Sequence, residues 1–293
     1  MRQTADNNMQ HSFSFGNIMR IIPPMLKCFL FFLAVIMIAA CSESDTNPPA
    51  ERMVDDVSYG PFARNKMDLN LPANRSQKTQ VVVLVHGGGW REGSKADFRS
   101  IAQQFADNGY ATVSIDYRYA DADNAVDYTD LLQDIDQALL FLKENAEEYV
   151  LNPDHVTLFG HSAGAHLSLL YAYRNNERGQ VKSVIALAAP TDLPALLAIE
   201  VFPSLLYNLV GTDDLNRLED ASPIRHIHGN VVPTYLFHGR GDNSIPPLQS
   251  EALFEILHER NGLVHKIRLF DGVGHDFSAE TLQTILAESL AFI

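Results

Sequence analysis

The residues best suited to chemistry form the pentapeptide G-H-S-A-G at positions 160–164, in which glycines stand two positions either side of a serine. An apolar run at 156–159 precedes it and a helical stretch follows, a context that predicts a tight strand-to-helix turn. Glycines leave room for the strained backbone of such a turn, which lifts the serine hydroxyl into the open. The start of the following helix favours negative charge developing on a bound carbonyl group. We therefore predict that Ser162 is a nucleophile in acyl transfer.

A second motif, H-G-G-G-W at positions 86–90, follows the solid apolar run 81–85. Glycines at this point allow backbone N–H groups to approach a developing oxyanion. A glycine triplet by itself indicates only a flexible turn, so the serine motif downstream decides the interpretation. Together the two motifs resemble the HGGG-type esterases of the α/β-hydrolase superfamily. The resemblance implies an oxyanion hole formed by the N–H groups of Gly87, Gly88 and Ala163.

A serine hydroxyl needs a base, and the base needs an orienting carboxylate. In the fold that the resemblance implies, the base follows the last strand, where His275 stands. The acid is expected after the preceding strand, and Asp242 lies in H-G-R-G-D-N-S-I-P, which resembles the family's H-G-x-x-D-x-x-V-P with Ile in place of Val. Asp192 is the alternative, since some relatives take the acid from an earlier strand. His238, within the same stretch, is interpreted as a surface or structural residue.

Further side chains follow strand ends near the predicted site. Trp90 and the segment 116–119, which includes Arg118, either line the substrate pocket or pack internally, with an ion pair for the arginine. No histidines or acids take metal-ligand spacing such as H-E-x-x-H, and the proposed chemistry requires no cofactor. The expected partner is a small-molecule ester.

The scaffold that positions these residues can be predicted from the apolar pattern. Residues 54–59 and 66–71 alternate polar and apolar around Gly60-Pro61, as in an antiparallel hairpin at a sheet edge. Strands and helices then alternate, which predicts a mostly parallel sheet with helices on both faces, as in the α/β-hydrolase fold. Residues 191–222 interrupt the alternation and are expected to form a small helical cap. The expected strands are 81–85, 111–116, 155–159, 181–187, 231–237 and 264–270, and the expected helices are 96–108, 126–145, 163–174, 248–260 and 277–291.

The N-terminal region carries an export pattern. Residues 28–40 are thirteen apolar residues preceded by Arg20 and Lys27, a length typical of a signal peptide and short for a membrane span. The run ends I-A-A-C, which resembles the bacterial lipobox and implies lipid attachment at Cys41, with simple cleavage as the alternative. We expect a signal peptide at 1–40, a tether at 41–53 and a catalytic domain at 54–293. With serine next to the cysteine, the lipobox rule implies the outer membrane, otherwise the protein is periplasmic or secreted.

Composition narrows the function classes. The chain of 293 residues is 46% hydrophobic with a formal charge of −14, which fits one globular enzyme domain and argues against nucleic acid as a partner. Contact with a membrane is expected only through the lipid anchor. Only one cysteine would remain after processing, so no intramolecular disulfide is expected.

The whole of residues 54–293 resembles bacterial feruloyl-esterase-like and kynurenine-formamidase-like hydrolases. The resemblance implies cleavage of esters with short or aromatic acyl groups through an acyl-enzyme intermediate. An amidase or formamidase would use the same triad. A catalytically silent binding module on this fold typically lacks a triad member, and every member is present in this sequence.

Overall fold

The computed structural model of the protein describes residues 48–229, 231–259 and 262–293. The predicted export signal and Cys41 lie outside these residues. In the described part of the chain, no helix is both long and apolar enough to cross a bilayer.

The centre of the described structure is an eight-stranded sheet with the order β1-β2-β4-β3-β5-β6-β7-β8. The pairs β1–β2 and β2–β4 are antiparallel, and every other neighbouring pair is parallel. The strands are β1 (Arg52–Ser58), β2 (Lys66–Leu71), β3 (Val81–Val85), β4 (Ala111–Asp116), β5 (Val156–His161), β6 (Val181–Leu187), β7 (Thr234–Gly239) and β8 (His265–Phe270).

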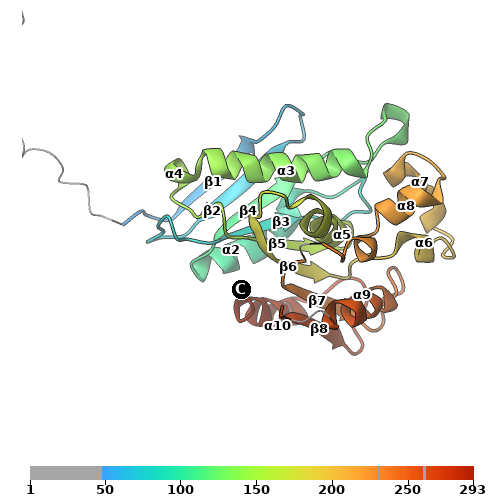
Figure 1. The fold of residues 1–293 in the computed structure, drawn as a ribbon. Coiled ribbons are helices and arrows are strands. Elements are labelled where there is room, and N and C mark those ends of the chain that lie inside the picture. Colours follow the sequence, from blue (N-terminus) through green and yellow to red (C-terminus); the bar gives the residue numbers. More distant parts are fainter. Residues whose placement is uncertain (1–47, 230, 260–261) are drawn as a thin grey trace, which may run out of the picture. The chain divides into compact units, whose positions relative to one another are not determined.

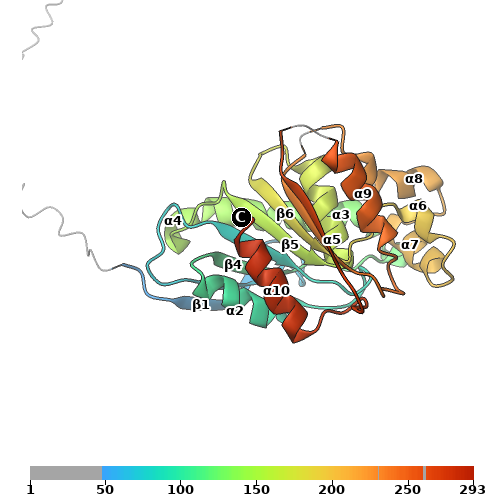
Figure 2. The ribbon, with the colours of Figure 1, turned by 90° about the horizontal axis from the view of Figure 1, so that it is seen from below.

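Helices cover both faces of this sheet, with α3, α5 and α9 on one face and α2 and α10 on the other (Figures 1 and 2). The helices are α2 (Arg99–Asp107), α3 (Tyr128–Glu144), α4 (Ala146–Tyr149), α5 (Ala163–Leu170), α6 (Leu193–Leu196), α7 (Phe202–Val210), α8 (Leu215–Asp220), α9 (Leu248–His258) and α10 (Ala279–Leu290).

The two faces bury separate apolar clusters. Successive side chains of a strand point to opposite faces, so Val83 of β3 joins the larger cluster under α3 and α5, and its neighbour Leu84 joins the smaller cluster under α2 and α10. All five residues of β3 are buried, which explains its unbroken apolar sequence.

The predicted elements are present with shifted ends. β1 begins at Arg52, inside the segment expected to be a tether. α5 ends at Leu170 and continues as a wider π-helical turn over Tyr171–Asn175. The predicted cap contains α6, α7 and α8, which lie together beyond the strand ends (Figure 1).

Candidate active site

Ser162 occupies the turn between β5 and α5 with a positive φ, at φ 53° and ψ −121°. Glycine is required at both flanking positions because any side chain there would collide with the backbone. A Cβ on Gly160 would lie 2.4 Å from the carbonyl oxygen of Gly164, and a Cβ on Gly164 would lie 2.0 Å from the carbonyl oxygen of Val85. The G-x-S-x-G pattern therefore reflects how closely the turn packs against itself and against β3.

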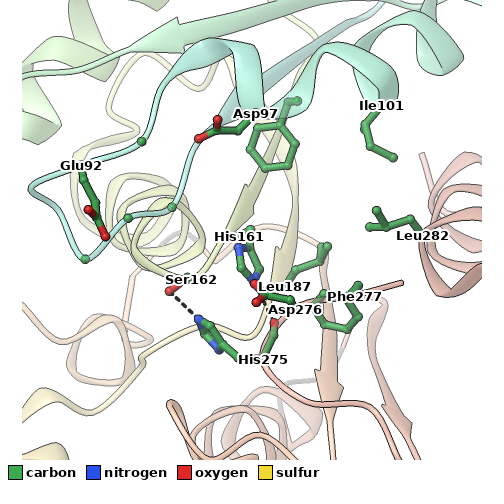
Figure 3. Close-up of a pocket in the computed structure, with 15 residues that line it drawn as sticks. Glu92, Asp97, Ile101, His161, Ser162, Leu187, His275, Asp276, Phe277 and Leu282 are labelled. Atoms are coloured by element: carbon green, nitrogen blue, oxygen red, sulfur yellow. Dashed lines mark hydrogen bonds between the residues drawn. The ribbon is translucent and has the colours of Figure 1, made fainter. Parts of the chain in front are cut away.

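The structure brings Ser162, His275 and Asp242 together. His275 Nε2 lies 3.0 Å from Ser162 Oγ, as drawn in Figure 3, and His275 Nδ1 lies 2.7 Å from Asp242 Oδ2. With Nδ1–H donating to the carboxylate, Nε2 is free to accept the serine proton. This is the geometry of a nucleophile, its base and an orienting acid.

The carboxylate of Asp242 is buried and held on both oxygens. Its Oδ1 accepts the N–H groups of Ser244 and Ile245, each at 2.8 Å. Burial by itself would raise the pKa of Asp242, but hydrogen bonds from His238, His275 and the Ile245 N–H lower that pKa well below its usual range. The acid is therefore ionised at neutral pH.

His238 is a site residue whose role the sequence did not reveal. It is fully buried, and its Nε2–H lies 3.2 Å from Asp242 Oδ2 and 2.9 Å from the Ile245 carbonyl oxygen. Its Nδ1 lies 2.7 Å from the Ser250 hydroxyl oxygen, which donates to it. Of the two interpretations given for His238, surface or structural, its buried position fits the structural one, and the side chain it holds is Asp242. The signal was the four-residue spacing in H-G-x-x-D.

His161 contacts the loop that carries the base. Its Nε2–H donates to the carbonyl oxygen of His275 at 3.0 Å, and the two rings lie 5.0 Å apart. Burial, followed by the nearby His275 ring, lowers the pKa of His161. A neutral His161 thus holds the His275 backbone in place.

The glycines of the H-G-G-G-W loop face Ser162. Gly88 has φ +97°, and a Cβ there would lie 2.2 Å from the Glu92 carbonyl oxygen, so only glycine fits. Gly87 and Gly88 line the same pocket as Ser162. Ala163 is buried at the first position of α5, where its N–H has no acceptor within the helix. These are the three groups predicted for the oxyanion hole.

Trp90 packs internally and does not line the pocket. The residue is 1% exposed, and its indole N–H donates to His166 Nδ1 at 3.1 Å. His166 is also buried, and its Nε2–H donates to the Ala221 carbonyl oxygen at 2.7 Å. This chain of bonds ties the glycine loop to α5 and to the end of the cap.

The segment after β4 is internal as well. Arg118 forms ion pairs with Asp130 at 3.0 Å and with Asp134 at 2.8 Å. Tyr117 is buried and donates its hydroxyl proton to the carbonyl oxygen of His86 at 2.9 Å, which supports the start of the glycine loop.

The alternative acid is placed elsewhere. Asp192 precedes α6 at the start of the cap, and its carboxylate lies 3.7 Å from the guanidinium of Arg225. The carboxylate bonded to His275 belongs to Asp242.

Ser162 and His275 open into a pocket of about 600 Å³. None of the residues of the cap, 191–222, is among the residues that line this pocket. The cap instead contacts the back of the glycine loop, where a Cβ on Gly89 would lie 3.4 Å from Leu205. The lining residues are Gly87, Gly88, Gly89, Glu92, Gly93, Asp97, Phe98, Ile101, His161, Ser162, Leu187, His275, Asp276, Phe277 and Leu282.

Within residues 48–229, 231–259 and 262–293, no group of three or more histidine, cysteine or acidic residues is placed so that it could hold a metal ion.

Comparison with known families identifies the group to which this arrangement belongs. The family model described as BD-FAE matches residues 67–257, which include Ser162 and Asp242. The chain belongs to the BD-FAE family. The match ends before His275, so the assignment of His275 as the base depends on the distances given above.

Curated relatives of this BD-FAE protein include a probable isoprenylcysteine alpha-carbonyl methylesterase of Oryza sativa. It is 29% identical over 243 residues, which cover 75% of this chain and 56% of the relative. The chain thus spans about half the length of this curated relative.

Solved structures show that this BD-FAE protein has the α/β-hydrolase fold predicted from its sequence. A bifunctional GH43-CE protein of Bacteroides eggerthii matches with a TM-score of 0.72 at 24% identity, covering 82% of this chain and 38% of the other. An esterase B of Lactobacillus rhamnosis matches with a TM-score of 0.70 at 23% identity, covering 92% of this chain and 95% of the other.

Proposed function

We propose that this protein is a carboxylic-ester hydrolase that works through a covalent acyl-enzyme. The observation that carries the proposal is the bonded series from Ser162 through His275 to the buried Asp242, beside a pocket bordered by a glycine loop. The esterase names of the relatives support the same reaction class.

In the proposed mechanism, Ser162 Oγ attacks the ester carbonyl carbon while His275 Nε2 takes the hydroxyl proton. The carbonyl oxygen becomes an oxyanion, which the N–H groups of Gly87, Gly88 and Ala163 stabilise. His275 then gives its proton to the departing alcohol. Water, deprotonated by His275, attacks the acyl-enzyme and releases the acid and Ser162.

Short or aromatic acyl groups are the proposed substrates. A pocket of about 600 Å³ can hold such a group beside the serine, and its wall includes apolar side chains such as Phe98 and Phe277.

The decisive test is covalent labelling. A fluorophosphonate probe should label the wild type and leave Ser162→Ala unlabelled, and the same substitution should abolish ester hydrolysis. Labelling that survives the substitution would remove Ser162 from the nucleophile role.

A substrate panel separates the ester from the amide reaction. The panel would include acyl esters, acetylated and feruloylated sugars, and N-formyl amides. Ester hydrolysis with little amide hydrolysis is expected. Faster hydrolysis of the N-formyl amides would make the protein an amidase, and a chain that binds these compounds without turnover would be a binding module.

We further propose that the protein is exported and carries lipid on Cys41, with the outer membrane as its site. The support is the apolar run that ends I-A-A-C. Expressed in a bacterium, the wild type should incorporate labelled fatty acid and partition into detergent, whereas Cys41→Ala should do neither. Wild-type protein without lipid would contradict the proposal.

A further inference from the structure

The apolar part of the pocket lies between α2 and α10, and its wall comes from outside the cap. We propose that it is the subsite for the uncharged alkyl or aryl group of the ester, and that Ile101 and Leu282 limit the length of that group. The inference rests on the proposed ester hydrolysis and assigns substrate selection to two helices that carry no catalytic residue.

The sequence explains why an apolar hollow forms there. Each of the two helices carries apolar residues at spacings of three and four, which form a stripe facing the sheet. Phe105 of α2 and Ile285 of α10 are fully buried in the smaller core cluster. The earlier members of the two stripes, Ile101 of α2 and Leu282 of α10, reach the pocket. Phe98, directly before α2, lines it as well.

The order of residues along the pocket agrees with this role. Figure 3 shows Ser162 beside His275 on one side, and Ile101 and Leu282 on the side away from the serine. Leu187 and Phe277 lie between these two ends. A group attached to the reacting carbonyl and directed along this wall would meet Ile101 and Leu282 last.

The gap between the two helices is held by a surface contact. The side-chain amide of Gln283, next to Leu282, donates to Gln104 Oε1 of α2 at 2.6 Å. This exposed bond links α10 to α2 close to the far end of the pocket.

Charge in the pocket selects against anions. The carboxylates of Glu92, Asp97 and Asp276 line the pocket, and its lining contains no lysine or arginine. A negatively charged group in the subsite would leave water for an apolar wall and meet charges of its own sign. The fitting ligand is therefore an uncharged alkyl or aryl group.

The geometry is compatible with a group on either side of the ester bond, so the experiment varies both. One series consists of p-nitrophenyl esters with growing acyl chains, and the other of acetate esters with growing alkyl alcohols. For each series, the measured quantity is the ratio of kcat/KM for the long member to that for the short member. A buried methylene changes such a ratio by about fourfold.

Leu282→Trp fills the far end and should lower this ratio by about tenfold or more in one of the two series. Leu282→Ala lengthens the subsite and should move the preferred chain length upward in that same series. A shift in the acyl series assigns the subsite to the acyl group, and a shift in the alcohol series assigns it to the alcohol. Ile101→Ala provides a second variant at the same end if Leu282→Trp fails to fold.

The matched control is Leu215→Trp on α8 of the cap, an exposed leucine outside the pocket lining, which should leave the ratio within about twofold of the wild type in both series. The subsite is overturned if the Leu282 variants, folded and labelled by the fluorophosphonate probe, keep the wild-type ratio in both series. It is also overturned if Leu215→Trp changes the ratio as much as Leu282→Trp does. A wild type that hydrolyses no ester would instead refute the proposed function.

Discussion

The cap and the pair α2 and α10 both border the region of Ser162, but they contribute different things to it. The cap supplies hydrogen bonds: the Ala221 carbonyl accepts from His166, and Asn208 donates to the Ala120 carbonyl. The helices α2 and α10 supply the apolar wall of the pocket. A segment that interrupts the strand–helix alternation, such as residues 191–222, therefore need not cover the substrate pocket. In this protein the cap braces the glycine loop from behind.

The largest expected effect is a difference in kcat between variants of two acids, Asp192 at the start of the cap and Asp242 after β7. Asp242→Asn should lower kcat by a factor on the order of 10⁴, because the wrong tautomer of the base is then favoured. Asp192→Asn should lower kcat little, since the carboxylate of Asp192 makes a long ionic contact with the partly exposed Arg225, at 3.7 Å. Steady-state kinetics of both variants check this, and the reverse ranking would move the acid to the cap side.

The buried hydrogen-bonded link from Trp90 through His166 to Ala221 should make the free energy of unfolding depend on pH. Burial lowers the pKa of His166 from 6.5 to about 4. As the pH falls, the imidazole of His166 therefore takes up a proton in the unfolded chain before it does so in the folded protein. The contribution of neutral His166 to the free energy of unfolding is complete above about pH 6.5 and is lost as the pH falls towards about 4. The loss should be on the order of 3 kcal/mol.

Urea unfolding of the wild type and of His166→Leu between about pH 7.5 and 4.5 measures this effect. The leucine variant should lose free energy of unfolding less steeply as the pH falls. His258→Gln, which alters an exposed histidine, is the control. If the free energy of unfolding has the same pH dependence in the wild type and in His166→Leu, protonation of His166 does not cause the loss of stability.

A smaller change tests the same link from the loop side. Trp90→Phe removes the indole N–H and leaves the acceptor Nδ1 of the buried His166 without its partner, which should cost about 1–3 kcal/mol of unfolding free energy. Because Trp90 follows the oxyanion glycines, kcat should fall while KM changes little. Tyr110→Phe, at a ring packed on Phe105 away from the loop, is the control. A change in KM alone would place Trp90 in substrate binding.

The smallest effect concerns acyl length. Catalytic efficiency on p-nitrophenyl esters should peak between about two and six acyl carbons, with steps of about fourfold per methylene up to the limit of the pocket. A chain-length series measured below the micelle limit checks this. Efficiency that rises steadily past about ten carbons would contradict a short acyl site.

Much of the site could be predicted because its requirements are local. Gly160 and Gly164 are fixed by contacts within one turn and with the adjacent strand, and Gly88 by its own backbone angle. His275 followed from chain order in the fold that the motifs implied. The role of His238 could not be predicted, because its contact with Asp242 depends on how both side chains turn inside the core.

Backbone sterics and apolar periodicity act between near neighbours in the chain, so the amino-acid sequence suffices to predict the alternation of strands and helices, the turn that holds Ser162 and the glycine loop. The folded structure was needed to see which acid meets His275, that Trp90 is packed against His166, and that the pocket wall comes from α2 and α10. Those outcomes depend on side chains far apart in the sequence. Leu282 lies 181 positions after Ile101, yet the two line one pocket because both helices pack on the same face of the sheet.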